Sequence, residues 1–102
     1  MTLHELNELR WHMAYDATEF FGRMMAEPKE HAELPGPENP LIMCRKCPGR
    51  NGHFSIRIWL DNNCSAGPWH AQRRDRVGTG SDPGEAVRQW FDGIDVKWQG
   101  DW

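Results

Sequence analysis

Two of the chain's three cysteines are spaced so that they could bind one metal ion. Cys44 and Cys47 are separated by two residues, a gap at which two thiolates commonly hold Zn²⁺. Cys64 with His70 or His53 could complete a set of four ligands. We expect no cofactor, because the second closely spaced pair of a zinc ribbon is missing. A zinc ion bound by Cys44, Cys47, Cys64 and His70 is the alternative interpretation.

The separation of the cysteines also favours thiols without a metal. If residues 53–60 form one strand, they carry the chain about 25 Å from the Cys44–Cys47 loop. Cys64 would then lie at the far end of the sheet. Three cysteines, an odd number, also fit free thiols in a reducing compartment better than a disulfide framework.

The sequence contains none of the common catalytic or phosphate-binding patterns. It has no G-x-S-x-G nucleophile elbow, no H-E-x-x-H zinc motif and no glycine-rich phosphate loop with its lysine. We therefore expect a protein that binds a partner and does not catalyse a reaction.

Charge is sorted along the chain. Residues 1–40 carry eight acidic and three basic side chains, residues 41–77 carry two acidic and seven basic ones, and residues 78–102 carry five acidic and two basic ones. The overall charge of −3 therefore hides a basic middle between acidic ends. Such a distribution bears on the choice of partner rather than on the fold.

The basic middle also contains the clearest strand pattern. Apolar and polar residues alternate over residues 53–60, which is typical of an antiparallel strand with one buried face. Residues 69–77 predict a further strand. The side chains expected inward are Phe54, Ile56, Ile58, Leu60, Trp69, Ala71 and Val77. The side chains expected on the opposite, outer face are His53, Ser55, Arg57, Trp59, His70, Gln72, Arg74 and Arg76.

This outer face has the chemistry of a binding surface for anions. Arginine side chains bind carboxylate and phosphate groups through paired hydrogen bonds, and Trp59 could stack on a base. The face therefore suits an acidic protein surface or a single-stranded nucleic acid. The acidic ends of the chain would repel phosphate at low salt, so we favour a protein partner.

A long helix is predicted at the N-terminus. Thr2 and Glu5 have the spacing of a capping box, and apolar residues then recur at helical spacing to about residue 26. Arg10 falls within the apolar arc and must reach a carboxylate or solvent. Trp11 and Tyr15 lie off the arc, so we expect them to form a second partner contact or a homodimer interface.

The whole chain predicts a single α+β domain over residues 1–102. It consists of the N-terminal helix (1–26), a linker rich in proline and glutamate (27–40), and a sheet with a C-terminal helix (41–102) that begins at Asp82-Pro83. The predicted order is α-β-β-β-α, a three-stranded antiparallel sheet with two helices packed on one face. Residues 95–102 could add a short edge strand.

This order of elements resembles the double-stranded-RNA-binding domain. The stretch Gly78-Thr79-Gly80-Ser81, before a helix that contains Ala86, is similar to that family's last loop, and the likeness covers residues 41–92 as a layout. That family carries a lysine pair at the start of its final helix, where this chain has Asp82-Pro83. The resemblance therefore implies a layout and not the binding of double-stranded RNA.

Together these patterns predict a non-catalytic intracellular interaction protein, an adaptor or an inhibitor, that binds an acidic surface of a macromolecular partner. No apolar run approaches the roughly 20 residues that span a bilayer, and the start does not resemble a signal peptide, so we expect a cytoplasmic protein. A single-stranded nucleic-acid-binding module or a small zinc-stabilised module are the alternatives. The predicted partner-binding residues are Arg57, Trp59, His70, Arg74, Arg76, Trp11 and Tyr15.

Overall fold

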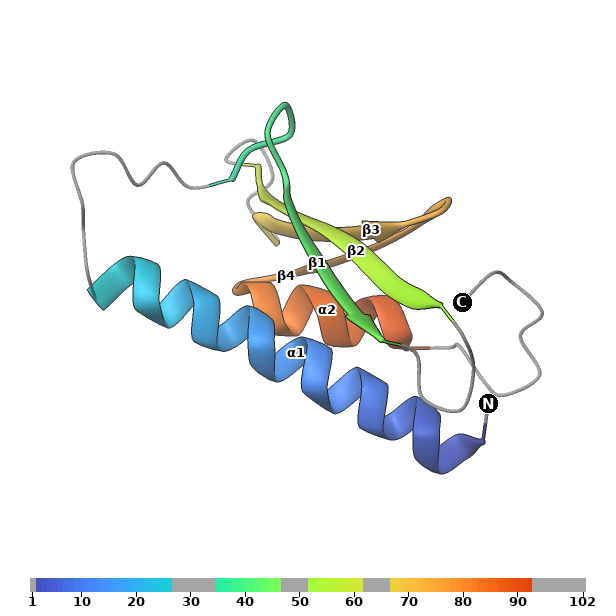
Figure 1. The fold of residues 1–102 in the computed structure, drawn as a ribbon. Helices are drawn as coiled ribbons and strands as arrows, with labels where there is room; N and C mark the ends of the chain where they lie inside the picture. Colours follow the sequence, from blue (N-terminus) through green and yellow to red (C-terminus); the bar gives the residue numbers. More distant parts are fainter. Residues whose placement is uncertain (1, 27–34, 47–51, 62–66, 93–102) are drawn as a thin grey trace.

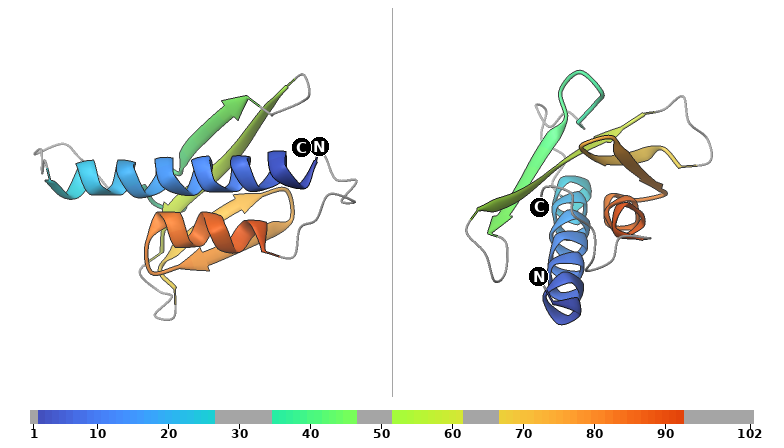
Figure 2. Two further views of the ribbon diagram at one scale, coloured as in Figure 1. Left: turned by 90° about the horizontal axis from the view of Figure 1, so that it is seen from below. Right: turned by 90° about the vertical axis from the view of Figure 1, so that its right-hand side faces the viewer.

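The computed structural model describes residues 2–26, 35–46, 52–61 and 67–92. The elements of this part follow the order α1 (Leu3–Ala26), β1 (Leu41–Lys46), β2 (His53–Leu60), β3 (Trp69–Arg73), β4 (Arg76–Gly80) and α2 (Pro83–Phe91). The strands form one antiparallel sheet in the order β1-β2-β3-β4. Both helices lie on the same side of this sheet (Figure 1, Figure 2). The predicted α+β class is confirmed.

Among the described residues the predicted antiparallel sheet is present, with four strands where three were expected. The stretch 69–77 is not one strand, because the chain reverses at Arg74 and Asp75 and β4 returns beside β3. Arg74 takes a left-handed backbone conformation with φ 59°, which is uncommon outside glycine, asparagine and aspartate. The expected loop at Gly78-Thr79-Gly80 is part of β4, so the layout departs from that of the double-stranded-RNA-binding domain.

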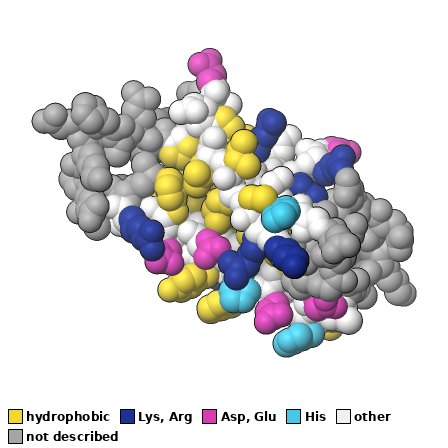
Figure 3. All heavy atoms as spheres, in the orientation of Figure 1, with side chains coloured by type: hydrophobic (Ala, Val, Ile, Leu, Met, Phe, Trp, Pro, Cys, Tyr) yellow, Lys and Arg dark blue, Asp and Glu magenta, His cyan; other side chains and the backbone are white. Residues whose placement is uncertain are grey.

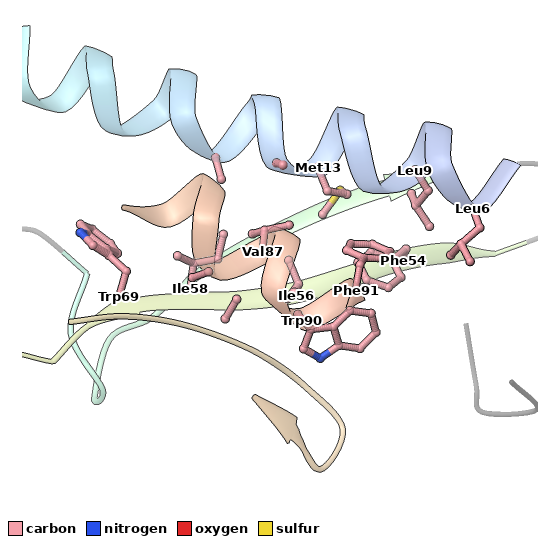
Figure 4. Close-up of a cluster of buried hydrophobic side chains, with 14 residues drawn as sticks. Leu6, Leu9, Met13, Phe54, Ile56, Ile58, Trp69, Val87, Trp90 and Phe91 are labelled. Atoms are coloured by element: carbon pink, nitrogen blue, oxygen red, sulfur yellow. The ribbon is translucent and has the colours of Figure 1, made fainter. Parts of the chain in front are cut away.

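The core lies between β2 and the two helices. Phe54, Ile56 and Ile58 are buried and point toward the helices, as their alternation predicts (Figure 4). Trp69 and Ala71 of β3 join them, whereas Val77 is exposed because it lies beside Gln72 in the register. The helices contribute Leu6, Leu9, Met13, Ala14, Ala17, Ala86, Val87, Trp90 and Phe91.

Glycine allows α2 to lie directly on β4. A Cβ atom at Gly78 would overlap the backbone of Ala86 and Trp90, and one at Gly80 would lie 2.7 Å from the Ala86 nitrogen. Trp90 closes the same contact, since its indole Nε1 donates hydrogen bonds to the carbonyls of Arg76 at 3.0 Å and Arg73 at 3.3 Å. The β3–β4 hairpin and α2 therefore form one unit.

Both helices begin at the residues that the sequence indicates. The Thr2 amide donates to Glu5 Oε1 at 2.9 Å and the Glu5 amide donates to Thr2 Oγ1 at 3.2 Å, which is the predicted capping box. These hydrogen bonds hold the pKa of the Glu5 carboxyl below its usual value. Asp82 accepts from the Glu85 amide at 2.9 Å, and Pro83 is the first residue of α2.

Two predicted segments lie wholly or partly outside the described residues. The C-terminal edge strand predicted at 95–102 and residues 27–34 of the predicted linker lie outside the described residues. The rest of the linker makes a tight turn, in which the Asn39 amide donates to the Gly36 carbonyl at 3.0 Å. Leu60 at the end of β2 donates to the Pro35 carbonyl at 2.7 Å. No helix in the described ranges is long and apolar enough to cross a membrane.

Candidate interaction surface

The strand register determines which side chains share the face of the sheet that points away from the helices. Arg57 lies between Ile42 of β1 and Gln72 of β3, and Gln72 in turn lies beside Val77 of β4. Neither α1 nor α2 covers this face (Figure 2). We call it the outer sheet face, and its side chains are those of Ile42, Cys44, Lys46, His53, Ser55, Arg57, Trp59, His70, Gln72, Val77 and Thr79.

Charge separates between the two layers of the fold. The four strands contain five Lys and Arg residues and no Asp or Glu, whereas α1 contains four acidic and two basic side chains. In the view of Figure 3, acidic side chains lie mainly over α1. The segments that differ in charge along the sequence therefore lie in different layers of the fold, with basic residues in the sheet and acidic residues mainly in α1.

Only part of the positive charge of the sheet reaches the outer sheet face. Arg45 turns to the helix side and forms an ion pair with Asp16 of α1 at 3.0 Å. Arg76, predicted on the outer face, also lies on the helix side, where its Nε donates to the Trp90 carbonyl at 2.5 Å. That prediction was wrong because the reversal at Arg74 and Asp75 places Arg76 opposite Arg73, which is itself on the inward side.

The Arg73 side chain lies where the pairing between β2 and β3 ends. Beyond the Arg57–Gln72 pair, β3 no longer pairs with β2, so Ser55 has no ladder partner on that side. The Arg73 guanidinium donates to the Ser55 carbonyl at 3.0 Å and lies over the Phe54 ring, 4.7 Å from its centroid. This contact places a third guanidinium near those of Arg57 and Arg74.

The three arginines line a hollow of about 390 Å³ on the outer sheet face. Arg57 is exposed and forms no hydrogen bond or ion pair with any other described residue. No acidic side chain is among the described residues around the hollow, which are Ile42, Ser55, Ile56, Arg57, Gln72, Arg73 and Arg74. Guanidinium groups in this arrangement can bind a carboxylate or a phosphate group.

Trp59 and His70 lie together at the other end of this face. Their rings are stacked, with centroids 5.4 Å apart and planes 7° from parallel, and both side chains are half-buried. His70 Nε2 is buried and has no hydrogen-bond partner within the described ranges. Because His70 covers one face of the indole, Trp59 has less ring surface to offer a nucleic-acid base.

The register also bears on the metal hypothesis. Cys44 is exposed on the outer sheet face, while Cys47 and Cys64 lie outside the described residues. Cys44 is opposite Ser55 and His70 is opposite Trp59, which separates them by about 13 Å along the strands and about 10 Å across them. One zinc ion cannot bridge that distance, and His53 is the nearer histidine to Cys44. Within the described ranges, no three His, Cys, Asp or Glu side chains form a metal site.

Trp11 and Tyr15 belong to a different surface. Both project from α1, where the two residues are 61% and 54% exposed, and α1 lies on the side of the sheet opposite the outer sheet face (Figure 2). The structure therefore divides the predicted partner-binding residues into two groups. Arg57, Trp59, His70 and Arg74 share the sheet surface, and Trp11 and Tyr15 share the helix surface.

Sequence reasoning missed two exposed apolar residues of the outer sheet face. Ile42 is 60% exposed and Val77 is 46% exposed. The strand 41–46 begins Leu-Ile-Met, so its apolar residues occupy both faces and give no alternation to follow. A two-residue turn at Asn51-Gly52 would have placed Lys46 opposite Arg57, whereas the observed register places Ile42 there, so this turn signal would not have identified the neighbour.

Comparison of the chain with protein-family models, with curated proteins and with solved structures finds no match. Function is therefore inferred from the geometry and charge of the chain's own surfaces.

Proposed function

We propose that this chain is a non-catalytic intracellular interaction protein, an adaptor or an inhibitor, that binds an acidic surface of a protein partner through the outer sheet face. The observation that carries the proposal is the hollow lined by Arg57, Arg73 and Arg74 on a sheet whose strands hold no acidic residue. Carboxylates are the groups that such a surface complements.

The apolar residues beside the hollow favour a protein over a nucleic acid. Ile42 and Val77 flank Arg57 and Gln72 in one row across the sheet. Protein interfaces combine an apolar centre with charged groups around it, whereas single-stranded nucleic-acid sites stack bases on free aromatic rings. The only tryptophan among the described residues of this face, Trp59, is stacked on His70.

Replacing Arg57 by glutamate tests the proposal. Arg57 is exposed and Arg57→Glu reverses a charge in the hollow without touching the core. We expect the variant to bind a short glutamate peptide at least about tenfold more weakly, since loss of a charged partner and new repulsion each weaken a complex. Isothermal calorimetry at low salt measures the change.

Arg23→Glu is the matched control. Arg23 is exposed on α1, where it pairs with Glu19 at 2.6 Å, so the same charge reversal is made away from the sheet. Equal weakening by both variants would show a non-specific effect of net charge and contradict the proposal. Binding of a thymidine oligonucleotide, with a salt slope near −0.7 per phosphate contacted, and no binding of the glutamate peptide would favour a nucleic-acid partner instead.

A further inference from the structure

A second hollow, of about 440 Å³, lies in the helix layer. It is separate from the outer sheet face, because the described residues that line it all belong to α1 and α2. Arg10, Trp11, Ala14, Tyr15, Thr18 and Arg88 are among the described residues that line it.

The close approach of the two helices shapes the floor of this groove. Gly84 of α2 packs on α1 so closely that a Cβ atom there would overlap Thr18 Oγ1 and lie 3.0 Å from the Ala14 carbonyl oxygen. The small side chains of Ala14 and Thr18 therefore leave a depression above the crossing. Arg88, one turn after Gly84 on α2, lines the same depression.

The aromatic wall of the groove is rigid and exposed. The rings of Trp11 and Tyr15 are stacked, with centroids 5.3 Å apart and planes 10° from parallel. Stacking fixes both side chains before any partner arrives, so little side-chain freedom is lost on binding. Tryptophan, tyrosine and arginine are the residues that contribute most to protein–protein affinity, and all three types are present here.

The two sides of this aromatic ridge carry opposite charge. At about 100° per residue, Ala14 and Thr18 lie on the side of the ridge that faces α2 and Arg88. Glu8 and Glu19 lie on the other side, and both are exposed; Glu19 pairs with Arg23 at 2.6 Å and Glu8 lies 4.0 Å from His4. Arg10 already binds Asp92 at 2.6 Å, whereas Arg88 forms no hydrogen bond or ion pair with the residues described here.

We infer that this groove is a homodimer interface, in which the ridge of one copy occupies the groove of another. A twofold axis along α1 turns the acidic side of one copy toward the Arg88 side of its partner. Each copy then covers the Trp11–Tyr15 ridge of the other. Glu8 or Glu19 of each copy faces Arg88 of its partner, so the same charged contact occurs on both sides of the axis. The chain itself supplies both the aromatic, acidic ridge and the apolar, basic groove that receives it.

The mass of the protein in solution tests this inference. Sedimentation equilibrium of the wild type across the micromolar range should show a reversible rise from 11.9 kDa toward twice that mass. The double variant Trp11→Ala/Tyr15→Ala removes the ridge and should stay at the lower mass. Both side chains are mostly exposed, so the fold should persist, as circular dichroism can verify.

Charge reversal makes the test specific for this interface. The variants Arg88→Glu and Glu8→Lys/Glu19→Lys should each raise the dimer Kd by roughly tenfold, because every altered pair occurs twice. An equimolar mixture of the two should dimerise again, since each mixed dimer contains only opposite charges. Arg57→Glu, on the outer sheet face, should dimerise like the wild type.

Two results would overturn the inference. One is a wild type that keeps the mass of a single chain up to about 1 mM. The other is a dimer that survives loss of Trp11 and Tyr15 but is broken by Arg57→Glu. Neither result depends on the glutamate-peptide experiment, so the dimer and the proposed function can fail separately.

Discussion

Gly78 shows how one residue fixes the distance between a strand and a helix. A side chain there would overlap the backbone of α2, and backbone cannot move aside as a flexible side chain can. Gly78→Ala should therefore lower the free energy of unfolding by about 1–3 kcal/mol, the usual cost of overpacking. Urea unfolding followed by circular dichroism measures this change.

Gly22 is the control for the same substitution. It lies in α1, and apart from its own helical turn no described atom lies within 4 Å of the position of an added Cβ. Gly22→Ala should raise the free energy of unfolding by about 0.5–1 kcal/mol, because alanine loses less backbone entropy in a helix. If Gly78→Ala were as stable as the wild type, the close packing of α2 on β4 would be disproved.

Single residues also explain where sequence reasoning succeeded and where it failed. The buried side chains of β2 could be predicted, because Phe54, Ile56 and Ile58 alternate strictly with polar neighbours. Arg76 could not be placed, because the turn before it uses Arg74 in a left-handed conformation. An arginine carries no turn signal, whereas asparagine or glycine at that position would have indicated a hairpin.

At the scale of elements, the ends of the helices were predictable and the edges of the sheet were not. Caps act within four residues, so Thr2 with Glu5 and Asp82 with Pro83 could be recognised from sequence alone. The position of β4 depends on its packing against Gln89 and Trp90 of α2, since Gln89 accepts hydrogen bonds from the amide and hydroxyl of Thr79. Such contacts between distant segments have no local pattern.

The capping box of α1 predicts a dependence on pH. The pKa of Glu5 is lowered, first by its hydrogen bond with the Thr2 amide and then by that with the Thr2 hydroxyl. The Glu5 carboxylate therefore contributes its full stabilisation at pH values above the ordinary carboxyl pKa, about 4.3 for glutamate. This stabilisation is lost as the pH falls through the lower pKa of the folded state. Thr2→Ala removes the hydroxyl but keeps the backbone amide, so it should move the pKa of Glu5 only part of the way back toward the ordinary value.

Carbon-detected NMR titration of the Glu5 carboxyl group checks that shift. The stability advantage of the wild type over Thr2→Ala should also shrink as the pH falls below about 4. An unchanged Glu5 titration in Thr2→Ala would mean that the Thr2 hydroxyl does not take part in the capping box in solution.

At the scale of the whole molecule, the two layers present two different surfaces. Both helices lie on one side of the sheet, as Figure 2 shows, and the outer sheet face lies on the other side. The layout could be expected from the sequence, because one apolar side on each helix and on β2 allows only this two-layer packing. The division of the predicted binding residues between the two surfaces could not be predicted from the sequence. It depends on which sides of α1 and of the sheet remain uncovered in the folded protein.

This arrangement makes a further prediction if both surfaces act as proposed. A dimer formed through the helix layers would leave an outer sheet face free on each copy, and the pair could hold two acidic sites at once. Binding to a surface densely coated with glutamate peptide should then be strengthened by effective concentration, at least about tenfold beyond the single-site affinity. Trp11→Ala/Tyr15→Ala should lose that gain while binding the free peptide as the wild type does.

Surface plasmon resonance on the coated surface, with calorimetry on the free peptide, separates these two quantities. The wild type should dissociate slowly from a dense coating and fast from a sparse one, whereas the Trp11→Ala/Tyr15→Ala variant should dissociate fast from both. Arg57→Glu should dissociate faster than the wild type from both coatings, because it keeps the dimer but weakens the acidic contact. Equal dissociation of the wild type and the ridge variant from the dense coating would show that the two sheet faces do not act together.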